Sequence, residues 1–567
     1  MLNNFFLKKK NVKYIFVCGG VMSGVGKGIA TSSIARILAW HGYQTTCIKI
    51  DPYVNVDAGT MNPVEHGEVF VLKDGTECDQ DMGHYERFLN KELTKENYMT
   101  TGSVYLSLIQ KERSLYFDGK CVEVVPHVPL EVIDKINKAQ KLSKADIVIT
   151  EIGGTIGEYQ NLLFLEAVRI LKLKYPQDVL LIMVSYLPYQ GEGMELKTKP
   201  TQYAIRSLNS AGLQPDFILA RAIIPLDDNR KQKIAFNCNL NPDDVISAPD
   251  ENNIYKIPLN FEKDKLGIKI LSKLKLRPKR SLANGRSLWI KRLEQIRRAT
   301  KEIKIGIVGK YFKTGDFVLS DSYISVIEAI KHASWFLGYL PKIDWLNADE
   351  FEINSSNLSI LKNYHGIIIP GGFGSRGVEG KIMAIKYCRQ NKIPCFGLCY
   401  GLQLMIVEFA RNICGLKGAH TTEVNPKTKY PVVDILEEQK KLLKEKLYGG
   451  TMRLGDWECQ IKKGTIAYEA YKKIYVNQRK QPAFISVLER HRHRYEINPK
   501  YHKILQKYGF VFSGTSQKGI LVEIGELPQK IHPFFLGTQF HPEFKSRFLH
   551  PHPLFVEFIR ASSLNAA

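Results

Sequence analysis

Two apolar runs that each end in a glycine-rich turn divide this 567-residue chain. The first, KYIFVCGGVMSGVGKG, covers residues 13–28, and the second, KIGIVGKY, covers residues 304–311. Each is typical of a buried parallel strand that leads through a turn into a helix. Helix-like stretches alternate with further apolar runs, so the pattern predicts two α/β domains with doubly wound parallel sheets. The further strand-like runs cover residues 45–50, 145–150, 178–185, 216–224, 366–370 and 394–398.

A basic stretch separates the two halves. Residues 273–300 are rich in lysine and arginine, contain Pro278 and Gly285, and then become helix-like. We therefore expect an N-terminal domain over residues 1–272, a linker over 273–300 and a C-terminal domain over 301–567. Each domain is long enough for its own core, since domains usually run to roughly 100–200 residues.

Composition excludes several classes of protein. No apolar run approaches the roughly 18 residues of a transmembrane helix, and the apolar start continues into a strand without a cleavage site, which argues against a signal peptide. Ten scattered cysteines without a C-x-x-C pair favour a reduced, cytoplasmic protein over a disulfide framework. The net charge of +23 is spread along the chain without a nucleic-acid-binding motif. We expect neither membrane nor nucleic-acid binding and assign the charge no function.

Cys399 has the sequence setting of a nucleophile. In GLCYG, Gly397 and Gly401 stand two residues on either side of it, between a strand-like and a helix-like run. This is the spacing of a nucleophile elbow, in which a helix N-terminus stabilises the thiolate. Most cysteines are small packing residues, and Cys395, inside the strand, is expected to be one.

Partners for Cys399 occur elsewhere in the C-terminal half. In TQFHPEF, His541 could deprotonate the thiol and Glu543 could fix the imidazole tautomer. The backbone N–H groups of Tyr400 and of Gly372, in PGGFG, could stabilise an oxyanion. PGGFG, GLCYGLQ and FHPE, in this order, resemble a class I glutamine amidotransferase. That resemblance implies attack of Cys399 on the glutamine side-chain amide, with release of ammonia.

The N-terminal half carries a phosphate-loop candidate. GGVMSGVGKG follows the first strand, and Lys27 supplies a positive charge beside its exposed backbone N–H groups. A regular Walker A loop would need Gly at position 21 and Ser or Thr at position 28, where this chain has Val21 and Gly28. Asp81 and Glu151 lie at ends of different predicted elements, and together they could hold Mg²⁺ on triphosphate oxygens.

Colinear motifs across residues 12–560 resemble the CTP synthase family. They include GGVxSxxGKG, KIDPYVNVDAGTMNPVEHGEVFV, DMGHYERF, TEIGGTIGE, ELKTKPTQ, GGTMRLG and ERHRHRYEIN. The resemblance implies an N-terminal P-loop-like synthetase domain and a C-terminal class I glutaminase domain. It implies a ligase in which ATP phosphorylates the uracil 4-oxygen of UTP and ammonia, delivered through an internal tunnel, displaces the phosphate.

The resemblance also implies a set of binding residues, by family motif. ATP is expected on Gly24, Val25, Gly26, Lys27, Gly28, Ile29 and Asp81, with Mg²⁺ on Asp81 and Glu151 and the transferred phosphoryl group beside Lys49. UTP and CTP are expected on Ser23, Lys197, Thr198, Lys199, Pro200, Thr201, Gln202 and Lys233, and glutamine on Gly372, Tyr400, Gly401, Leu402, Gln403, Glu423 and Arg494.

Regulation and assembly follow from the same resemblance. GTP is expected to activate the enzyme at Phe373 and Arg376, and CTP to inhibit it at Glu158, Tyr159 and Gln160. These last three residues belong to EYQN, where the family usually has D-I-E. Residues 249–251 (PDE) replace a more basic stretch expected near adenine. The family forms homotetramers, and some members polymerise further into filaments.

Two alternatives stay open from the residues. One is another ATP-dependent amidotransferase of the same two-part plan, such as a cobyric-acid-type synthetase, which lacks KTKPTQ and DMGHYERF. The other is a basic scaffold protein with inactive sites, against which the intact Cys399, His541 and Glu543 argue.

Overall fold

In the computed structural model, the chain divides into two units, each built on its own sheet. The structure describes residues 12–62, 66–190, 195–279, 283–309, 313–314, 317–318, 320–435, 452–475 and 481–565. Unit 1 comprises residues 1–60 and 81–293, and unit 2 comprises residues 61–80 and 294–567. A short segment of the N-terminal half therefore belongs to the second unit.

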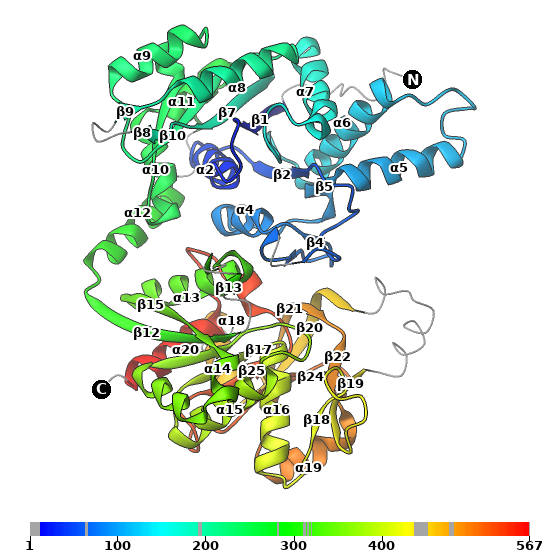
Figure 1. The fold of residues 1–567 in the computed structure, drawn as a ribbon, viewed down its shortest axis with the longest axis vertical. Coiled ribbons are helices and arrows are strands. Elements are labelled where there is room, and N and C mark those ends of the chain that lie inside the picture. The colour runs from blue at the N-terminus through cyan, green and yellow to red at the C-terminus, as the bar shows by residue number, and fades with distance from the viewer. Residues whose placement is uncertain are drawn as a thin grey trace. The chain divides into compact units, whose positions relative to one another are not determined.

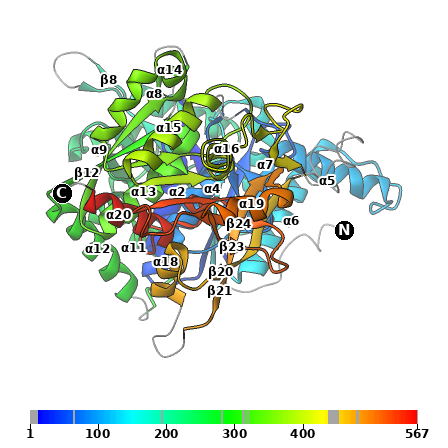
Figure 2. The same cartoon turned by 90° about the horizontal axis from the view of Figure 1, so that it is seen from below.

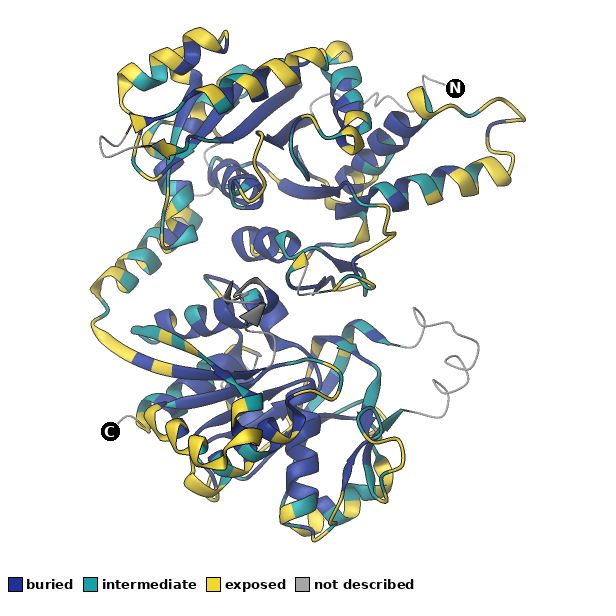
Figure 3. Cartoon of the chain, in the orientation of Figure 1, coloured by how far each residue is buried: buried dark blue, intermediate teal, exposed yellow. Residues whose placement is uncertain are grey.

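Unit 1 is built on a seven-stranded sheet in which all pairings are parallel (Figure 1). The three central strands are almost completely buried, because helices pack on both faces of the sheet (Figure 3). This confirms the predicted doubly wound fold. In spatial order the strands are β11 (Val245–Pro249), β10 (Phe217–Ala222), β7 (Val179–Tyr186), β1 (Lys13–Gly19), β6 (Ile147–Ile152), β2 (Thr45–Asp51) and β5 (Tyr98–Thr100).

Helices connect these strands, and the loops that carry the candidate nucleotide residues lie where strands end. A small hairpin, β8 (Tyr189–Gln190) with β9 (Glu195–Leu196), precedes the KTKPTQ motif. The helices are α2 (Lys27–Trp40), α4 (Asp81–Leu89), α5 (Thr101–Arg113), α6 (Val124–Ser143), α7 (Leu162–Lys174), α8 (Lys199–Ser210), α9 (Asp228–Asn237), α10 (Ile257–Lys263), α11 (Leu266–Lys273) and α12 (Ala283–Arg298).

Helix α12 occupies most of the stretch that the sequence assigned to a linker. Its first part packs in unit 1 through Trp289, whose ring lies 5.8 Å from that of Trp40 and whose Nε1 donates to the Tyr255 carbonyl oxygen at 2.8 Å. The division between the units falls within α12, after Leu293. Residues 280–282, also in the predicted linker, lie outside the described residues.

Unit 2 contains a nine-stranded mixed sheet (Figures 1 and 2). Pairings from β15 to β25 are parallel, as predicted, and those from β25 to β21 are antiparallel. In spatial order the strands are β15 (Tyr339–Asn347), β12 (Lys301–Gly309), β16 (Gly366–Ile369), β17 (Cys395–Leu398), β25 (Phe535–Thr538), β24 (Val522–Glu526), β23 (Val511–Thr515), β20 (Arg453–Lys462) and β21 (Phe484–His493).

Two apolar cores lie on opposite sides of this sheet. Helices α15 and α16 contribute to one core, and helices α13, α18 and α20 contribute to the other. A three-stranded sheet of β18 (His420–Thr421), β19 (Pro431–Ile435) and β22 (Tyr495–Ile497) adjoins the first core. The helices are α13 (Ile324–Phe336), α14 (Ala348–Ile353), α15 (Val378–Asn391), α16 (Tyr400–Asn412), α18 (Ile466–Tyr475), α19 (His502–Lys507) and α20 (Pro553–Leu564).

Candidate active sites

Cys399 forms the turn between strand β17 and helix α16. Its backbone has φ of 52° and ψ of −99°, a strained conformation that costs a non-glycine residue about 1–3 kcal/mol. A Cβ atom added at Gly397 would lie 2.8 Å from the Gly401 carbonyl carbon, and one added at Gly401 would lie 2.2 Å from the Ile369 oxygen. The two glycines thus let helix and strands approach closely enough to form the elbow, as their spacing indicated.

His541 and Glu543 form a buried pair beside this elbow. His541 Nδ1 lies 2.7 Å from Glu543 Oε1, so the carboxylate fixes the imidazole orientation. Burial alone would lower the pKa of His541, but Glu543 and the adjacent Cys399 together raise that pKa to about 10. The histidine is therefore able to hold a proton beside the Cys399 sulfur at neutral pH, as the general acid–base partner of a nucleophile must.

Gly371 lies against the side chains of Cys399 and His541. A Cβ atom added at Gly371 would lie 3.1 Å from His541 Cε1 and 3.9 Å from Cys399 Cβ. A side chain here would therefore compete with a substrate for the space between nucleophile and base. Gly372 is the next residue along the chain, and Tyr400 is the first residue of helix α16, directly after Cys399.

Two neighbours of the sulfur had no role assigned from sequence. The Cys399 thiol lies 3.7 Å from the Arg492 carbonyl oxygen, and Gln539 Nε2 lies 3.8 Å from the sulfur. Gln539 precedes the FHPE motif and is fully buried, and Arg492 lies within ERHRHRYEIN. The motifs that contain or adjoin these residues were recognised in the sequence. Contacts made by a main-chain oxygen or a side-chain amide leave no recognisable sequence pattern, so the two residues themselves were not identified.

Several of the predicted glutamine-binding residues lie in or next to helix α16, which follows the elbow. Gly374 N–H donates to Glu423 Oε1 at 2.7 Å, and the Tyr400 hydroxyl donates to the Gly374 carbonyl oxygen at 3.2 Å. Gln403 Nε2 donates to the Tyr495 carbonyl oxygen at 3.1 Å, next to Arg494 in the chain. Leu402 differs, because its side chain is part of the core and only its main chain is available to a ligand.

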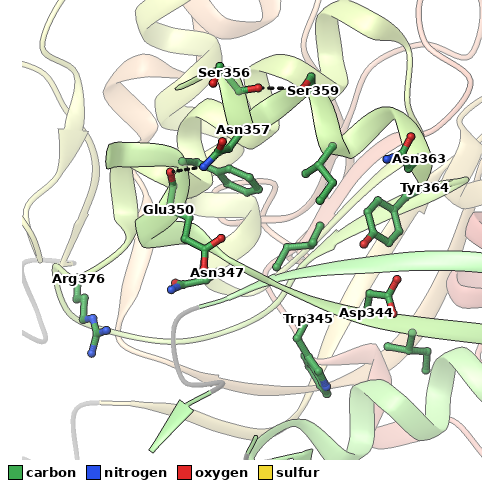
Figure 4. Close-up of a pocket in the computed structure, with 14 residues that line it drawn as sticks. Asp344, Trp345, Asn347, Glu350, Ser356, Asn357, Ser359, Asn363, Tyr364 and Arg376 are labelled. Carbon is green, nitrogen blue, oxygen red and sulfur yellow. Dashed lines mark hydrogen bonds between the residues drawn. The ribbon is translucent and has the colours of Figure 1, made fainter. Parts of the chain in front are cut away.

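Arg376 and Phe373, the predicted GTP residues, occupy different surroundings. Arg376 lies at the rim of a large cavity of about 1190 Å³ between strand β15 and residues 350–364 (Figure 4). Its guanidinium pairs with Asp349 at 2.8 Å. Phe373 is about half exposed and is not among the residues that line this cavity.

In unit 1 the phosphate-loop candidate connects β1 to α2. Gly24 and Gly26 have φ of 69° and 83°, and Gly26 caps the helix N-terminus, so glycine serves the turn at both positions. Lys27 Nζ donates to the Gly154 carbonyl oxygen at 2.9 Å. A Cβ atom added at Gly28 would lie 2.0 Å from Asp81 Oδ1. The Asp81 carboxylate therefore occupies the space where a Walker A loop has its Ser or Thr side chain.

Three carboxylates surround Lys49 next to this loop. Lys49 Nζ pairs with Asp81, lies 2.8 Å from Glu151 Oε1 and lies 3.7 Å from Asp51 Oδ1. Burial would raise the pKa of Asp81, but Lys49 lowers that pKa to about 2. Burial raises the pKa values of Glu151 and Asp51, and the nearby Asp81 charge adds to both. The excess of carboxylates over nearby cations favours uptake of a further positive charge.

The donor set fits Mg²⁺ rather than a structural metal. In the part of the chain that the structure describes, no group of three or more His, Cys, Asp or Glu side chains has the arrangement of a metal site. Mg²⁺ is commonly held by one or two carboxylates together with phosphate oxygens and water. Asp81 and Glu151, held together by Lys49, provide such a pair.

The close approach of Asp81 to Gly28 can be tested by adding a side chain at position 28. Replacing Gly28 by serine should displace the Asp81 carboxylate and reduce ATP-dependent turnover by roughly 10–100-fold, the effect of disturbing groups that support a metal site. Glutamine hydrolysis measured alone should stay unchanged. The matched control is Gly119→Asn, at a φ of 73° with open space around it, which should behave as wild type. Equal activity of the Gly28→Ser protein would contradict the proposed position of Asp81.

Most of the predicted uridine-nucleotide residues lie at or just before the start of helix α8. The hydroxyl groups of Thr201 and Ser185 are 2.8 Å apart, and a Cβ atom added at Gly20 of the phosphate loop would lie 3.0 Å from the Ser185 hydroxyl oxygen. Lys197 pairs with Glu195 at 2.7 Å, and the charge of Lys233, on helix α9, also acts on Glu195. Thr198 is buried and accepts from Gln202 Nε2 at 3.1 Å. Lys199 and Pro200 form the first turn of α8, and Ser23 is exposed in the phosphate loop.

The predicted inhibitory residues follow strand β6 in a compact turn. Glu158 accepts from the Thr155 N–H at 2.8 Å and from Gln160 Nε2 at 2.8 Å. These bonds lower the pKa of Glu158 against the effect of burial. Tyr159 is 91% exposed, so its ring is available to a ligand or a partner.

A mainly apolar pocket of about 120 Å³ lies beside the phosphate loop. Val25, Gly26 and Ile29, three of the residues that the sequence assigned to ATP, line it. Arg221, also in the lining, donates to Asp250 at 2.8 Å and to the Gly24 carbonyl oxygen at 3.1 Å. The sequence had marked residues 249–251 as unusual but had not identified Arg221.

Comparison with known proteins finds two families along the chain. Residues 13–276 match a family described as "CTP synthase N-terminus", and residues 318–561 match "Glutamine amidotransferase class-I". A protein named CTP synthase from Sulfolobus acidocaldarius is 48% identical over 97% of this chain and 99% of its own length. One of the same name from Bacillus subtilis is 46% identical over 97% of this chain and 98% of its own length.

One solved structure is also similar. It is described as the glutaminase domain of Trypanosoma brucei CTPS with bound acivicin, and it is 33% identical with a TM-score of 0.41. It covers 46% of this chain and 94% of its own length. Among the helices that the structure describes, none combines the length and apolar character needed to span a bilayer.

Proposed function

Because the chain belongs to the CTP synthase family, we propose that Cys399 in unit 2 and the Lys49 cluster in unit 1 are the two reaction centres of one synthesis. Members of this family are ligases that aminate UTP to CTP, with ATP as the energy source and glutamine as the nitrogen donor.

In the glutaminase step, the Cys399 thiolate attacks the side-chain amide carbon of glutamine. His541 transfers its proton to the departing ammonia, and Glu543 holds the imidazole for that transfer. Backbone N–H groups of Gly372 and Tyr400 bind the oxyanion, and Glu423 with Arg494 binds the ends of the substrate amino acid. Water then hydrolyses the glutamyl thioester and restores the thiol.

In the synthetase step, the 4-oxygen of UTP attacks the γ-phosphorus of ATP, because a carbonyl oxygen is a poor leaving group until it is phosphorylated. Ammonia then adds at that carbon and phosphate leaves. Lys49, close to Asp81 and Glu151, is placed to neutralise charge on the transferred phosphoryl group. Mg²⁺, held by Asp81 and Glu151, would neutralise the triphosphate oxygens.

In unit 1 we assign ATP to the phosphate loop and its adjoining pocket, and UTP to the neighbouring KTKPTQ region. The ATP phosphates would lie over residues 24–28 and its adenine in the pocket lined by Val25 and Ile29. The uridine triphosphate would take Ser23, residues 197–202 and Lys233. Ammonia must reach it unprotonated, since ammonium has no lone pair, so we propose an internal passage between the reaction centres.

We assign GTP activation to the surface with Phe373 and Arg376, and CTP inhibition to residues 158–160. A homotetramer, with filaments as a further assembly, fits the exposed apolar side chains of residues 106–125 in unit 1. These are Leu106, Ile109, Leu115, Tyr116, Val124 and Val125, each more than 40% exposed. A reduced, cytoplasmic setting fits ten free cysteines.

One observation carries the proposal: a cysteine–histidine–glutamate site and a lysine–carboxylate cluster beside a phosphate loop occur in the same chain. The test is to supply UTP, ATP, Mg²⁺ and glutamine and to follow the change in absorbance as uracil becomes cytosine. Formation of CTP and glutamate in equal amounts is expected. A cobyric-acid-type synthetase or an inactive scaffold would leave UTP unchanged even with free ammonia.

A further inference from the structure

The segment that unit 2 receives from the N-terminal half contains a small hairpin, β3 (Phe70–Val71) with β4 (Glu77–Cys78). Its main chain is fixed to strand β20. The Asp456 N–H donates to the Lys73 carbonyl oxygen at 2.8 Å. Gly455 has φ of 80°, and a Cβ atom added there would lie 2.5 Å from Gly75 N. The hairpin is thus an integral part of the glutaminase unit.

From this hairpin, Glu77 reaches the nucleophile through one residue. The Glu77 side chain is almost fully buried and accepts from Arg492 Nε at 2.8 Å. The carbonyl oxygen of the same Arg492 lies 3.7 Å from the Cys399 sulfur. The ion pair therefore holds the main-chain oxygen that faces the thiol.

A second connection leads to the base. The Phe70 ring lies 4.9 Å from the ring of Phe544, and the Phe544 ring stacks on that of His541 at 4.9 Å with an angle of 13° between the planes. Phe70 and Phe544 are both buried, so neither ring has room to move aside independently.

A third connection runs through strand β21. Arg490 is fully buried and donates to the Val71 carbonyl oxygen at 3.1 Å. Its own carbonyl oxygen accepts from the His541 N–H at 2.7 Å. Arg490 and Arg492 therefore link the two strands of the hairpin to the main chain beside both catalytic side chains.

We propose that this hairpin positions the cysteine–histidine pair, with Glu77 and Phe70 as the positioning residues. The N-terminal half thereby supplies supporting residues of the glutaminase, although none of them touches glutamine. Asp81, at the candidate phosphoryl-transfer site, follows Glu77 by only four residues. The test that compares synthesis from glutamine and from ammonia rests on the proposed function, whereas the measurement of Cys399 alkylation does not.

The first test measures the rate at which iodoacetamide alkylates Cys399 as a function of pH, by peptide mass spectrometry on the full chain, with Cys399→Ala as the blank. Glu77→Ala and Phe70→Leu should each slow alkylation at neutral pH by roughly 10-fold and move the midpoint of its pH profile upward, because misplaced partners stabilise the thiolate less. Glu77→Gln, which keeps an acceptor for Arg492, should recover most of the rate.

The second test measures catalysis by the same proteins. The kcat for glutamine hydrolysis should fall by roughly 10–100-fold in Glu77→Ala and Phe70→Leu with little change in KM, while CTP synthesis from ammonia is retained. Lys73→Gln, on the exposed side of the hairpin, is the matched control and should match wild type.

Wild-type alkylation and glutaminase rates in both variants would overturn the inference. So would equal losses of glutamine- and ammonia-dependent synthesis, since these indicate a general structural effect. If the wild-type protein itself fails to aminate UTP from ammonia, the proposed function fails, and the alkylation profiles still decide the role of the hairpin.

Discussion

Replacing Cys399 by alanine should abolish CTP synthesis from glutamine and leave synthesis from added ammonia close to the wild-type rate. The substitution removes the sulfur that forms the thioester, and removal of a nucleophile in a comparable site lowers turnover by about 10⁴-fold or more. The synthetase centre uses none of these atoms. CTP formation from each nitrogen donor, followed by absorbance, measures both rates on one protein preparation.

The elbow makes alanine a suitable replacement. Position 399 has a positive φ, and alanine is no more strained there than cysteine, so the fold should persist. Cys395→Ala, four residues earlier in the buried strand, is the matched control and should keep glutamine-dependent synthesis. Continued use of glutamine by the Cys399→Ala protein would show that another residue is the nucleophile.

Replacing Asp81 by asparagine should abolish CTP synthesis from both nitrogen donors. Asparagine has nearly the same size, so contact with Gly28 persists, but the negative charge beside Lys49 is lost. A metal held partly by Asp81 would lose a ligand, and we expect a fall of at least about 100-fold in ATP-dependent turnover. Glutamine hydrolysis without nucleotides should largely remain.

Chelation gives an independent measurement of the same site. EDTA should inactivate the wild-type synthetase reversibly and spare glutamine hydrolysis, and excess Mg²⁺ should restore little activity to Asp81→Asn. The control is Asp118→Asn, an exposed acid at a positive φ that asparagine tolerates well. Full synthetase activity of Asp81→Asn would exclude this carboxylate as a metal ligand.

Much of the fold followed from local patterns. The apolar runs at residues 45–50, 145–150 and 394–398 lie on strands β2, β6 and β17, because their side chains are buried on both faces of parallel sheets. The glycines around Cys399 indicated the elbow, because the G-x-C-x-G spacing is itself typical of that turn, although the close neighbour of Gly401 is Ile369 on another strand. The antiparallel half of the second sheet was not predicted, because alternation of strands and helices carries information only about parallel connections.

The candidate sites were only partly predictable. Sequence motifs marked His541, Glu543, Asp81 and Glu151, but not Gln539 beside the sulfur or Arg221 beside the phosphate loop. Leu402, expected at the glutamine site, packs its side chain in the core. A motif identifies a segment of chain, whereas the direction of each side chain depends on what the rest of the fold packs against it.

Local patterns were sufficient to predict two α/β halves, a strained cysteine turn and a glycine-rich phosphate loop, because these depend on side-chain periodicity and on φ values set within a few residues. The folded chain was needed to show that residues 66–80 belong to unit 2, and that Asp81 occupies the space next to Gly28. Glu77 and Arg492 pair across 415 positions of the chain. Such a contact depends on burial shared by distant segments, and no local pattern of residues encodes it.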